Sequence, residues 1–113
     1  MAFTPYHNIL GATAATWALL TPGDNASDVQ SILLTNVHAT ADATVSLHIE
    51  KLSSSSNQNA PETYYILKTV AIPSDTALLL DNASLLSFNN SVNGHGLYIT
   101  VGATDTVDVL VNI

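Results

Sequence analysis

The stretch ETYYILKTVAIPSDTALLLD, from Glu62 to Asp81, decides the fold class. It contains two apolar runs, at residues 64–72 and 77–80, and the first is rich in β-branched and aromatic residues that favour strands. The turn cluster Pro73-Ser74-Asp75 separates the two runs. Proline fixes φ and has no amide hydrogen to donate, so the first strand should end there. We therefore expect two consecutive β-strands.

Four further segments are predicted strands, and three of them have the alternating pattern of a strand with one face buried. The clearest is residues 44–52, where Val45, Leu47 and Ile49 alternate with polar residues, and residues 97–101 and 107–113 show the same period of two. Residues 31–38 carry apolar side chains on both faces at their start. We expect 31–38 and 44–52 to pair as a hairpin.

Two weaker strand patterns and one turn signal complete the series. Residues 12–20, which include Trp17, form a strand pattern in which the alanines leave a short helix open, and residues 85–88 predict a brief strand. Asn93-Gly94 tolerates positive φ at both positions and predicts a tight hairpin reversal.

Seven or eight short strands, with turn signals about every ten residues, are typical of two packed sheets. We expect an all-β protein, an antiparallel β-sandwich of the immunoglobulin-like or jelly-roll kind. Residues 1–113 should form a single domain, in which residues 1–11 are an extended N-terminal arm. The polar segment SSSSNQNAP, residues 53–61, should be an exposed loop.

The charge balance excludes one class of partner. The chain has two lysines, no arginine and nine acidic residues, for a net charge of −7. Two lysines cannot neutralise enough phosphates to bind nucleic acid. Charged residues make up 10% of the chain, against about 25% in a usual soluble domain. Because interfaces are depleted in Lys and Glu, much of the surface should contact other subunits, with an unusually uncharged free surface as the alternative.

The cysteine count and the apolar runs indicate where the protein is made. There is no cysteine, which fits a reducing compartment. The first residues carry no Lys or Arg and no long apolar core, unlike a secretory signal, and no apolar run approaches the length of a membrane span. We expect cytoplasmic synthesis and no membrane partner.

The residues that usually perform chemistry follow no known motif. The four histidines, His7, His38, His48 and His95, and the acidic residues match no hydrolase, zinc-protease or phosphate-loop pattern. We expect His48 to face solvent from its strand and His95 to lie in a turn. The sequence therefore predicts no catalytic residue, no cofactor and no metal site.

Aromatic and apolar residues near the N-terminus are the candidate partner interface. Phe3, Pro5, Tyr6 and His7 lie in the expected arm, and Trp17 follows in the first strand. Such a terminus is usually ordered only when a neighbour holds it. We expect these five residues to contact a partner.

The order of segments from about Ser31 to Ile113 resembles small virion proteins of tailed bacteriophages. Those proteins have a strand ending in Ile-Pro, a turn, a Leu-x-Leu strand, a short strand, a Gly-Leu strand and a valine-rich final strand. The corresponding residues here are Ile72-Pro73, Leu78 to Leu80, Gly96-Leu97 and Val107 to Val111. The pattern consists of strand and turn residues and contains no catalytic signature.

The resemblance implies a structural role in a phage particle. A capsid decoration, or cement, protein that stabilises the head shell is the expected role, and a tail, neck or baseplate component is the alternative. The partners would be the major capsid protein or other virion proteins, and the location would be the capsid surface. Closed cyclic symmetry would cover exposed sheet edges, so we expect a homo-oligomer, with a trimer as the working example.

A carbohydrate-binding sandwich is the alternative from another class. Trp17, Tyr64, Tyr65 or Tyr98 would then stack on a sugar ring. For Tyr64 and Tyr65, which lie in a continuous apolar run, packing in the core is the favoured expectation.

Overall fold

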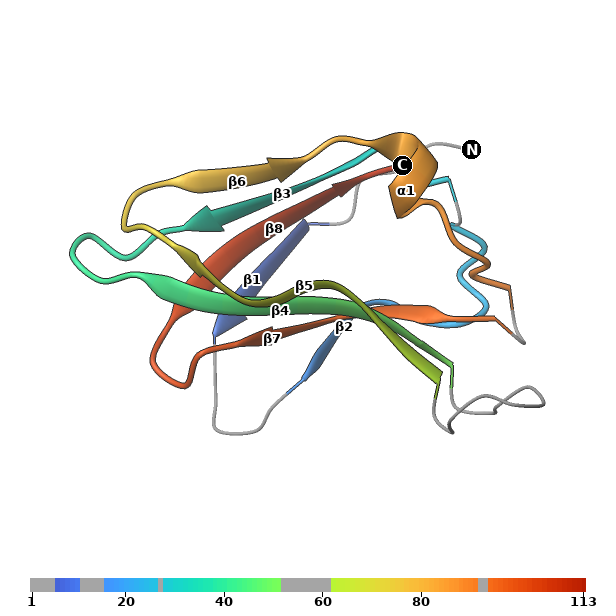
Figure 1. The fold of residues 1–113 in the computed structure, drawn as a ribbon, viewed down its shortest axis with the longest axis horizontal. Coiled ribbons are helices and arrows are strands. Elements are labelled where there is room, and N and C mark those ends of the chain that lie inside the picture. Colours follow the sequence, from blue (N-terminus) through green and yellow to red (C-terminus); the bar gives the residue numbers. More distant parts are fainter. Residues whose placement is uncertain (1–5, 11–15, 27, 52–61, 92–93) are drawn as a thin grey trace.

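The computed structural model describes residues 6–10, 16–26, 28–51, 62–91 and 94–113. These residues form eight strands and one short helix (Figure 1). In chain order the elements are β1 (Tyr6–Leu10), β2 (Trp17–Leu20), β3 (Ser31–Asn36), β4 (Ala43–Lys51), β5 (Glu62–Ile72), β6 (Ala77–Leu80), α1 (Ala83–Leu86), β7 (Gly96–Val101) and β8 (Thr106–Asn112).

The strands form two four-stranded sheets. The first sheet has the order β1-β8-β3-β6 and the second has the order β2-β7-β4-β5. Every hydrogen-bonded pair in both sheets is antiparallel. The prediction of an all-β antiparallel sandwich is therefore confirmed, as are the two strands in the stretch from Glu62 to Asp81.

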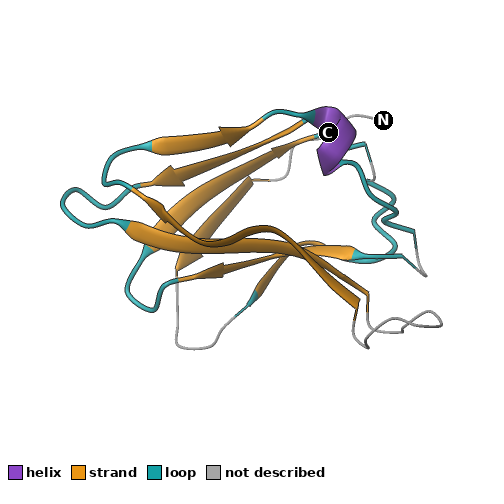
Figure 2. Cartoon of the chain, viewed as in Figure 1, coloured by secondary structure: helices purple, strands orange, loops and turns teal. Residues whose placement is uncertain are grey.

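The two sheets lie close together at one end of the molecule and diverge toward the other. The β3–β4, β5–β6 and β7–β8 turns lie at the narrow end (Figure 1). At the wide end, α1 and the loops before β3 and β7 lie between the edges of the two sheets (Figure 2). Turns and loops therefore close the sandwich at both ends.

The core follows the period of two that the sequence predicts. Val107, Val109 and Val111 of β8 are fully buried on the inner face of the first sheet. Leu47 and Ile99, on neighbouring strands of the second sheet, are equally buried. Since successive strand residues point to opposite faces, the residues between them form the outer faces.

The predicted hairpin of β3 and β4 is wrong. β3 pairs with β6 and β8, whereas β4 pairs with β5 and β7 in the other sheet. Both strands have an apolar face, and these faces cover each other across the sandwich instead of lying side by side. An alternating pattern shows which face is buried, but it does not show which sheet the strand joins.

The predicted strand at residues 85–88 is also wrong, because α1 (Ala83–Leu86) occupies its start. The carbonyl of Asn82 accepts hydrogen bonds from the amides of Leu85 and Leu86, and Leu86 is buried. Consequently Asn93-Gly94 does not join two paired strands, since the loop runs from α1 to β7. Asn93 itself lies outside the described residues.

The expectation that residues 1–11 form an extended arm is wrong for Tyr6–Leu10. These residues form strand β1 at the edge of the first sheet. Ile9 is buried opposite Val107, and the side-chain amide of Asn8 donates to the carboxylate of Asp108. The apolar partner and the side-chain hydrogen bond hold this segment on β8. Residues 1–5, 11–15 and the expected loop at 53–61 lie outside the described part of the chain.

Two buried asparagines hold the connections between the sheets. Asn90 accepts from the amide of Ala26 at 2.9 Å and donates to the carbonyls of Thr21 and His95 at 2.9 and 2.8 Å. Asn36 donates to the carbonyls of Ala41 and Ile72, both at 2.9 Å. Both side chains are fully buried and hydrogen-bonded, as buried polar groups need to be.

Replacing Asn90 by alanine tests this role. The substitution Asn90→Ala removes three hydrogen bonds and leaves buried backbone groups without partners, so we expect the free energy of unfolding to fall by about 3 kcal/mol. Urea denaturation measures it. The matched control Asn112→Ala changes an exposed asparagine and should have an effect within about 0.5 kcal/mol. Equal effects of the two substitutions would contradict the role of Asn90.

Candidate functional site

A row of aromatic side chains crosses the outer face of the second sheet. His48 of β4 lies directly opposite Tyr98 of β7 on one side and Tyr65 of β5 on the other. Directly opposed residues in antiparallel strands share a face and contact each other. The ring centroids of His48 and Tyr98 are 5.5 Å apart and the rings are nearly parallel, whereas Tyr65 lies 5.4 Å away and tilted. We call these three residues the aromatic row.

His48 is at the centre of the row and is only 7% exposed. The expectation that it faces solvent is therefore wrong. It does point to the outer face, but β4 is an inner strand of its sheet and aromatic rings lie on both sides of it. Its burial comes from cross-strand neighbours, which the sequence of β4 alone does not reveal.

Gly96 allows Tyr98 to take its position in the row. A Cβ atom at Gly96 would lie 2.7 Å from the ring and hydroxyl of Tyr98, so the tyrosine side chain lies directly over the glycine. Gly96 is paired with Glu50 of β4, which brings the tyrosine toward that carboxylate. Burial, and secondarily the charge of Glu50, raises the pKa of the Tyr98 hydroxyl. That hydroxyl therefore stays protonated at neutral pH and can donate a hydrogen bond.

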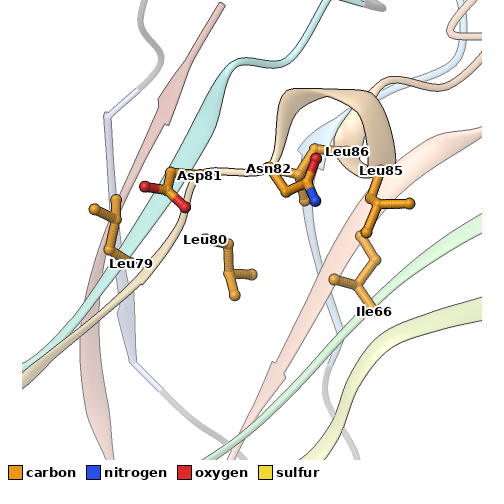
Figure 3. Close-up of a pocket in the computed structure, with 7 residues that line it drawn as sticks. All are labelled: Ile66, Leu79, Leu80, Asp81, Asn82, Leu85 and Leu86. Carbon is orange, nitrogen blue, oxygen red and sulfur yellow. The ribbon is translucent and has the colours of Figure 1, made fainter.

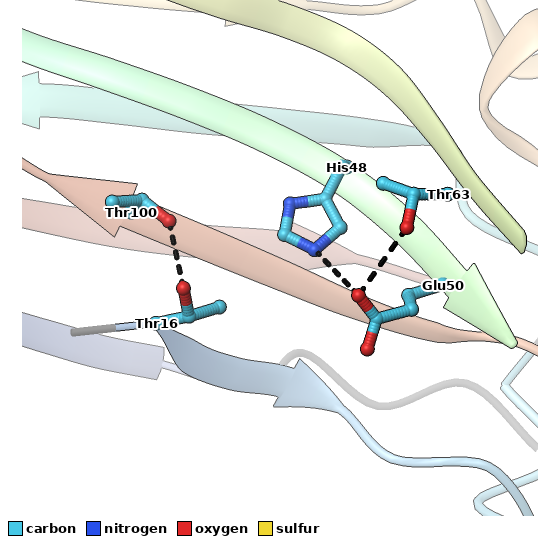
Figure 4. Close-up of polar contacts among 5 residues, drawn as sticks. All are labelled: Thr16, His48, Glu50, Thr63 and Thr100. Atoms are coloured by element: carbon cyan, nitrogen blue, oxygen red, sulfur yellow. Dashed lines mark hydrogen bonds and ion pairs between the residues drawn. The ribbon is translucent and has the colours of Figure 1, made fainter. Parts of the chain in front are cut away.

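A carboxylate and a hydroxyl lie beside the row (Figure 4). The carboxylate of Glu50 is 3.7 Å from Nε2 of His48 and accepts a hydrogen bond from the hydroxyl of Thr63 at 3.3 Å. Burial lowers the pKa of His48, and the opposing effect of Glu50 is smaller. The ring is thus neutral at pH 7, and the carboxylate favours the tautomer with its proton on Nε2. Nδ1 is then a buried acceptor without a hydrogen-bond partner among the described residues.

The local shape of β5 determines which of its tyrosines joins the row. The β4–β5 register shifts twice, on either side of Leu47, and Thr69 has a φ of 54° with its amide bonded to the hydroxyl of Ser46. Such bulges redirect side chains. Beyond them, Tyr65 faces outward with the ammonium of Lys68 5.0 Å from its ring centroid.

The expectation that Tyr64 and Tyr65 pack in the core is therefore wrong, since their exposed fractions are 45% and 52%. Tyr65 belongs to the aromatic row. Tyr64 is paired with Ile49, whose side chain packs on the core, so it lies on the other face of the sheet, with its ring 5.8 Å from that of His95. The apolar run did not reveal this because β5 is an edge strand.

The predicted partner interface is only partly described. Phe3 and Pro5 lie outside the described residues, and Tyr6 is described only as part of β1. His7 is half-buried, and burial lowers its pKa against a smaller effect of a hydrogen bond with the Leu19 backbone. Trp17 is 44% exposed and is paired with Ile99, so it lies on the opposite face from Tyr98. The structure does not bring Trp17 into the aromatic row.

A second surface feature is an apolar pocket that was not predicted from the sequence (Figure 3). Its volume is about 260 Å³, and it lies between β5, β6 and α1. Leu79 and Leu85 beside it are 54% and 76% exposed. We call this surface the leucine patch; its lining residues are Ile66, Leu79, Leu80, Asp81, Asn82, Leu85 and Leu86.

Among the residues that the structure describes, the other titratable side chains form no comparable site. Within the described ranges, no three His, Asp or Glu side chains come together as metal ligands would. Nδ1 of His38 accepts hydrogen bonds from the backbone amides of Thr40 and Ala41, both at 3.1 Å, and these bonds stabilise the β3–β4 turn. No helix in the described part of the chain is long and apolar enough to cross a bilayer.

Comparison of the chain with protein-family models, with curated proteins and with solved structures finds no significant match.

The burial of His48 predicts how stability depends on pH. Its pKa in the folded protein lies below the value of 6.5 for an unperturbed histidine, so the unfolded chain binds the proton more readily. The contribution of His48 is therefore fully present above about pH 6.5 and is lost as the pH falls toward the folded pKa. His7 acts in the same direction. Among the described residues, the titratable groups in contact with His48 are Glu50, Tyr65 and Tyr98, and the Lys68 ammonium lies over the Tyr65 ring.

We expect His48→Gln to flatten the loss of unfolding free energy between pH 7.5 and 5.5. Urea denaturation of both proteins at each pH measures this slope, and His7→Gln measures the share of the second histidine. Identical slopes for the wild type and His48→Gln would contradict the prediction.

Proposed function

We propose that this protein is a virion structural protein of a tailed phage, a capsid decoration protein that binds and stabilises the head shell. The observation that carries the proposal is the strand pairing. β1 pairs with β8, β2 with β7, β3 with β6 and β4 with β5. These are the pairs of one long hairpin that has been folded over into two sheets.

That pairing supports a jelly roll as the fold. An eight-stranded jelly roll consists of two sheets and two Greek keys, whereas an immunoglobulin constant domain places its first, second, fifth and fourth strands in one sheet. The order β1-β8-β3-β6 fits the first and differs from the second. Jelly rolls are common in viral capsid domains. The resemblance of Ser31 to Ile113 to phage virion proteins supports the same assignment.

The leucine patch is the surface that we assign to the capsid partner. An interface has an apolar centre and a polar rim. Here, exposed Leu79 and Leu85 stand beside the pocket, with Asp81 and Asn82 in its lining. β6 is also an edge strand of its sheet. Its unpaired backbone groups can therefore add to the contact through β-augmentation.

The proposal also covers the oligomeric state of the protein and its position in the phage particle. In the described part of the chain, each sheet has two edge strands: β1 and β6 in the first sheet, and β2 and β5 in the second. A cyclic homo-oligomer, with a trimer as the working example, would cover some of these edges. The alternative position is in the tail, neck or baseplate, where the protein would bind its partners through the same surfaces.

Co-sedimentation tests whether the protein binds to the head or to the tail. The purified chain, mixed separately with intact capsids and with isolated tails of the virus that encodes it, should pellet with capsids alone. Pelleting with tails alone would replace the head assignment with the alternative, and pelleting with neither would overturn the structural role.

Charged substitutions test the surface. We expect the double variant Leu79→Asp, Leu85→Asp to bind capsids at least about tenfold more weakly, because it places carboxylates in an apolar contact. The control Val37→Asp changes another exposed apolar residue, 43% exposed, directly after β3. It should bind as the wild type does, and equal losses would contradict the role of the patch.

A further inference from the structure

The aromatic row combines two kinds of surface that one class of ligand needs together. Tyr65 presents an aromatic ring that is 52% exposed. The next row of the same face holds the Glu50 carboxylate and the Thr63 hydroxyl, which are paired across β4 and β5. A pyranose sugar has an apolar C–H face, which can stack on a ring, and a rim of hydroxyls, which need acceptors and donors.

We propose that the outer face of the second sheet binds a neutral pyranose sugar, stacked on Tyr65, with its hydroxyls bonded to Glu50 and Thr63. This assignment goes beyond the structural role in the virion and does not depend on it.

A second observation at this site is the unsatisfied nitrogen of His48. The ring is more than nine-tenths buried between Tyr65 and Tyr98, and its Nδ1 has no partner among the described residues. Unpaired buried polar atoms are rare in native proteins and call for an explanation. With Nε2–H directed at Glu50, Nδ1 is an acceptor that is covered in the free protein, so a ligand reaches it only when a neighbouring ring moves aside. A sugar hydroxyl, directly or through one water, would satisfy it.

The remaining groups of the site favour a neutral sugar over a charged one. Glu50 is an acceptor with 27% of its side chain exposed, and the net charge of the chain is −7, so an acidic sugar would be repelled. The Lys68 ammonium lies over the Tyr65 ring, 5.0 Å from its centroid, so a sugar that stacks on that face of the ring displaces the ammonium, which can then donate to a sugar hydroxyl. The Tyr98 hydroxyl is a second donor on the same face of the sheet, beyond His48. The leucine patch lacks this combination of ring, carboxylate and hydroxyl.

Calorimetric titration of the full chain with chitotriose, maltotriose and mannotriose tests the assignment, with sialyllactose as the charged comparison. We expect at least one neutral trisaccharide to bind at about 10 mM, a concentration that detects millimolar affinity. Tyr65→Ala and Glu50→Gln should each weaken that binding at least about tenfold, as expected when one stacking or charge-assisted contact is lost. Tyr65→Phe keeps the ring and should retain the binding.

One tyrosine variant and one tryptophan variant are the matched controls. Tyr64→Ala removes the adjacent tyrosine, which has similar exposure but lies on the other face of the sheet, and Trp17→Ala removes an exposed ring outside the row. Both should bind sugar as the wild type does. The histidine ring signals of His48 should also shift in NMR spectra when sugar is added.

Three results would overturn the assignment: no binding of any neutral trisaccharide, binding of sialyllactose alone, or equal losses in Tyr65→Ala and Tyr64→Ala. Co-sedimentation with capsids separates this test from that of the structural role. Tyr65→Ala should still pellet with capsids, because the leucine patch is unchanged in it.

Discussion

The contact between two apolar inner faces is the constraint on which the rest of this structure depends. Val107, Val109 and Val111 of β8 lie on one side of that contact, and strands β4 and β7 supply the other. A shift of one residue in the register of β8 would turn its valines to solvent, so the core also determines the register. With the register fixed, the residues on the outer faces acquire definite cross-strand neighbours.

The outer face of the second sheet shows this effect. His48, Tyr65 and Tyr98 come from three strands that are far apart in the sequence, and only the pairing of β4 with both neighbours brings them together. Glu50 and Gly96 are paired in the same way, which places a carboxylate beside a tyrosine that lies over a glycine. The inner face stabilises the fold, and the outer face is free to carry chemistry.

Local sequence predicted most of the strands, but it missed β1, placed a strand where α1 begins and did not predict how the strands pair. The period of two in residues 97–101 and 107–113 gave the correct buried faces, because burial acts on each strand separately. The pairing of β3 and β4 was wrong, since two strands with one apolar face can lie side by side or face each other. The aromatic row could not be predicted either. It depends on the register of β4 and β5, which the bulge at Thr69 alters, and on the edge position of β5, which leaves Tyr64 and Tyr65 exposed. The buried Asn36 and Asn90 gave no signal, as asparagine is common in exposed turns.

Neighbouring residues of β5 serve the two surfaces, since Ile66 lines the leucine patch and Tyr65 points away from it into the aromatic row. A subunit that binds through its leucine patch would therefore leave Tyr65 uncovered. If the chain decorates a shell and binds sugar, as we propose, the shell would display many weak sites at fixed spacing. The strength of attachment to a sugar-coated surface would then depend on how many sites are engaged together. The geometry of the particle, more than the affinity of one chain, would then determine which surfaces it holds.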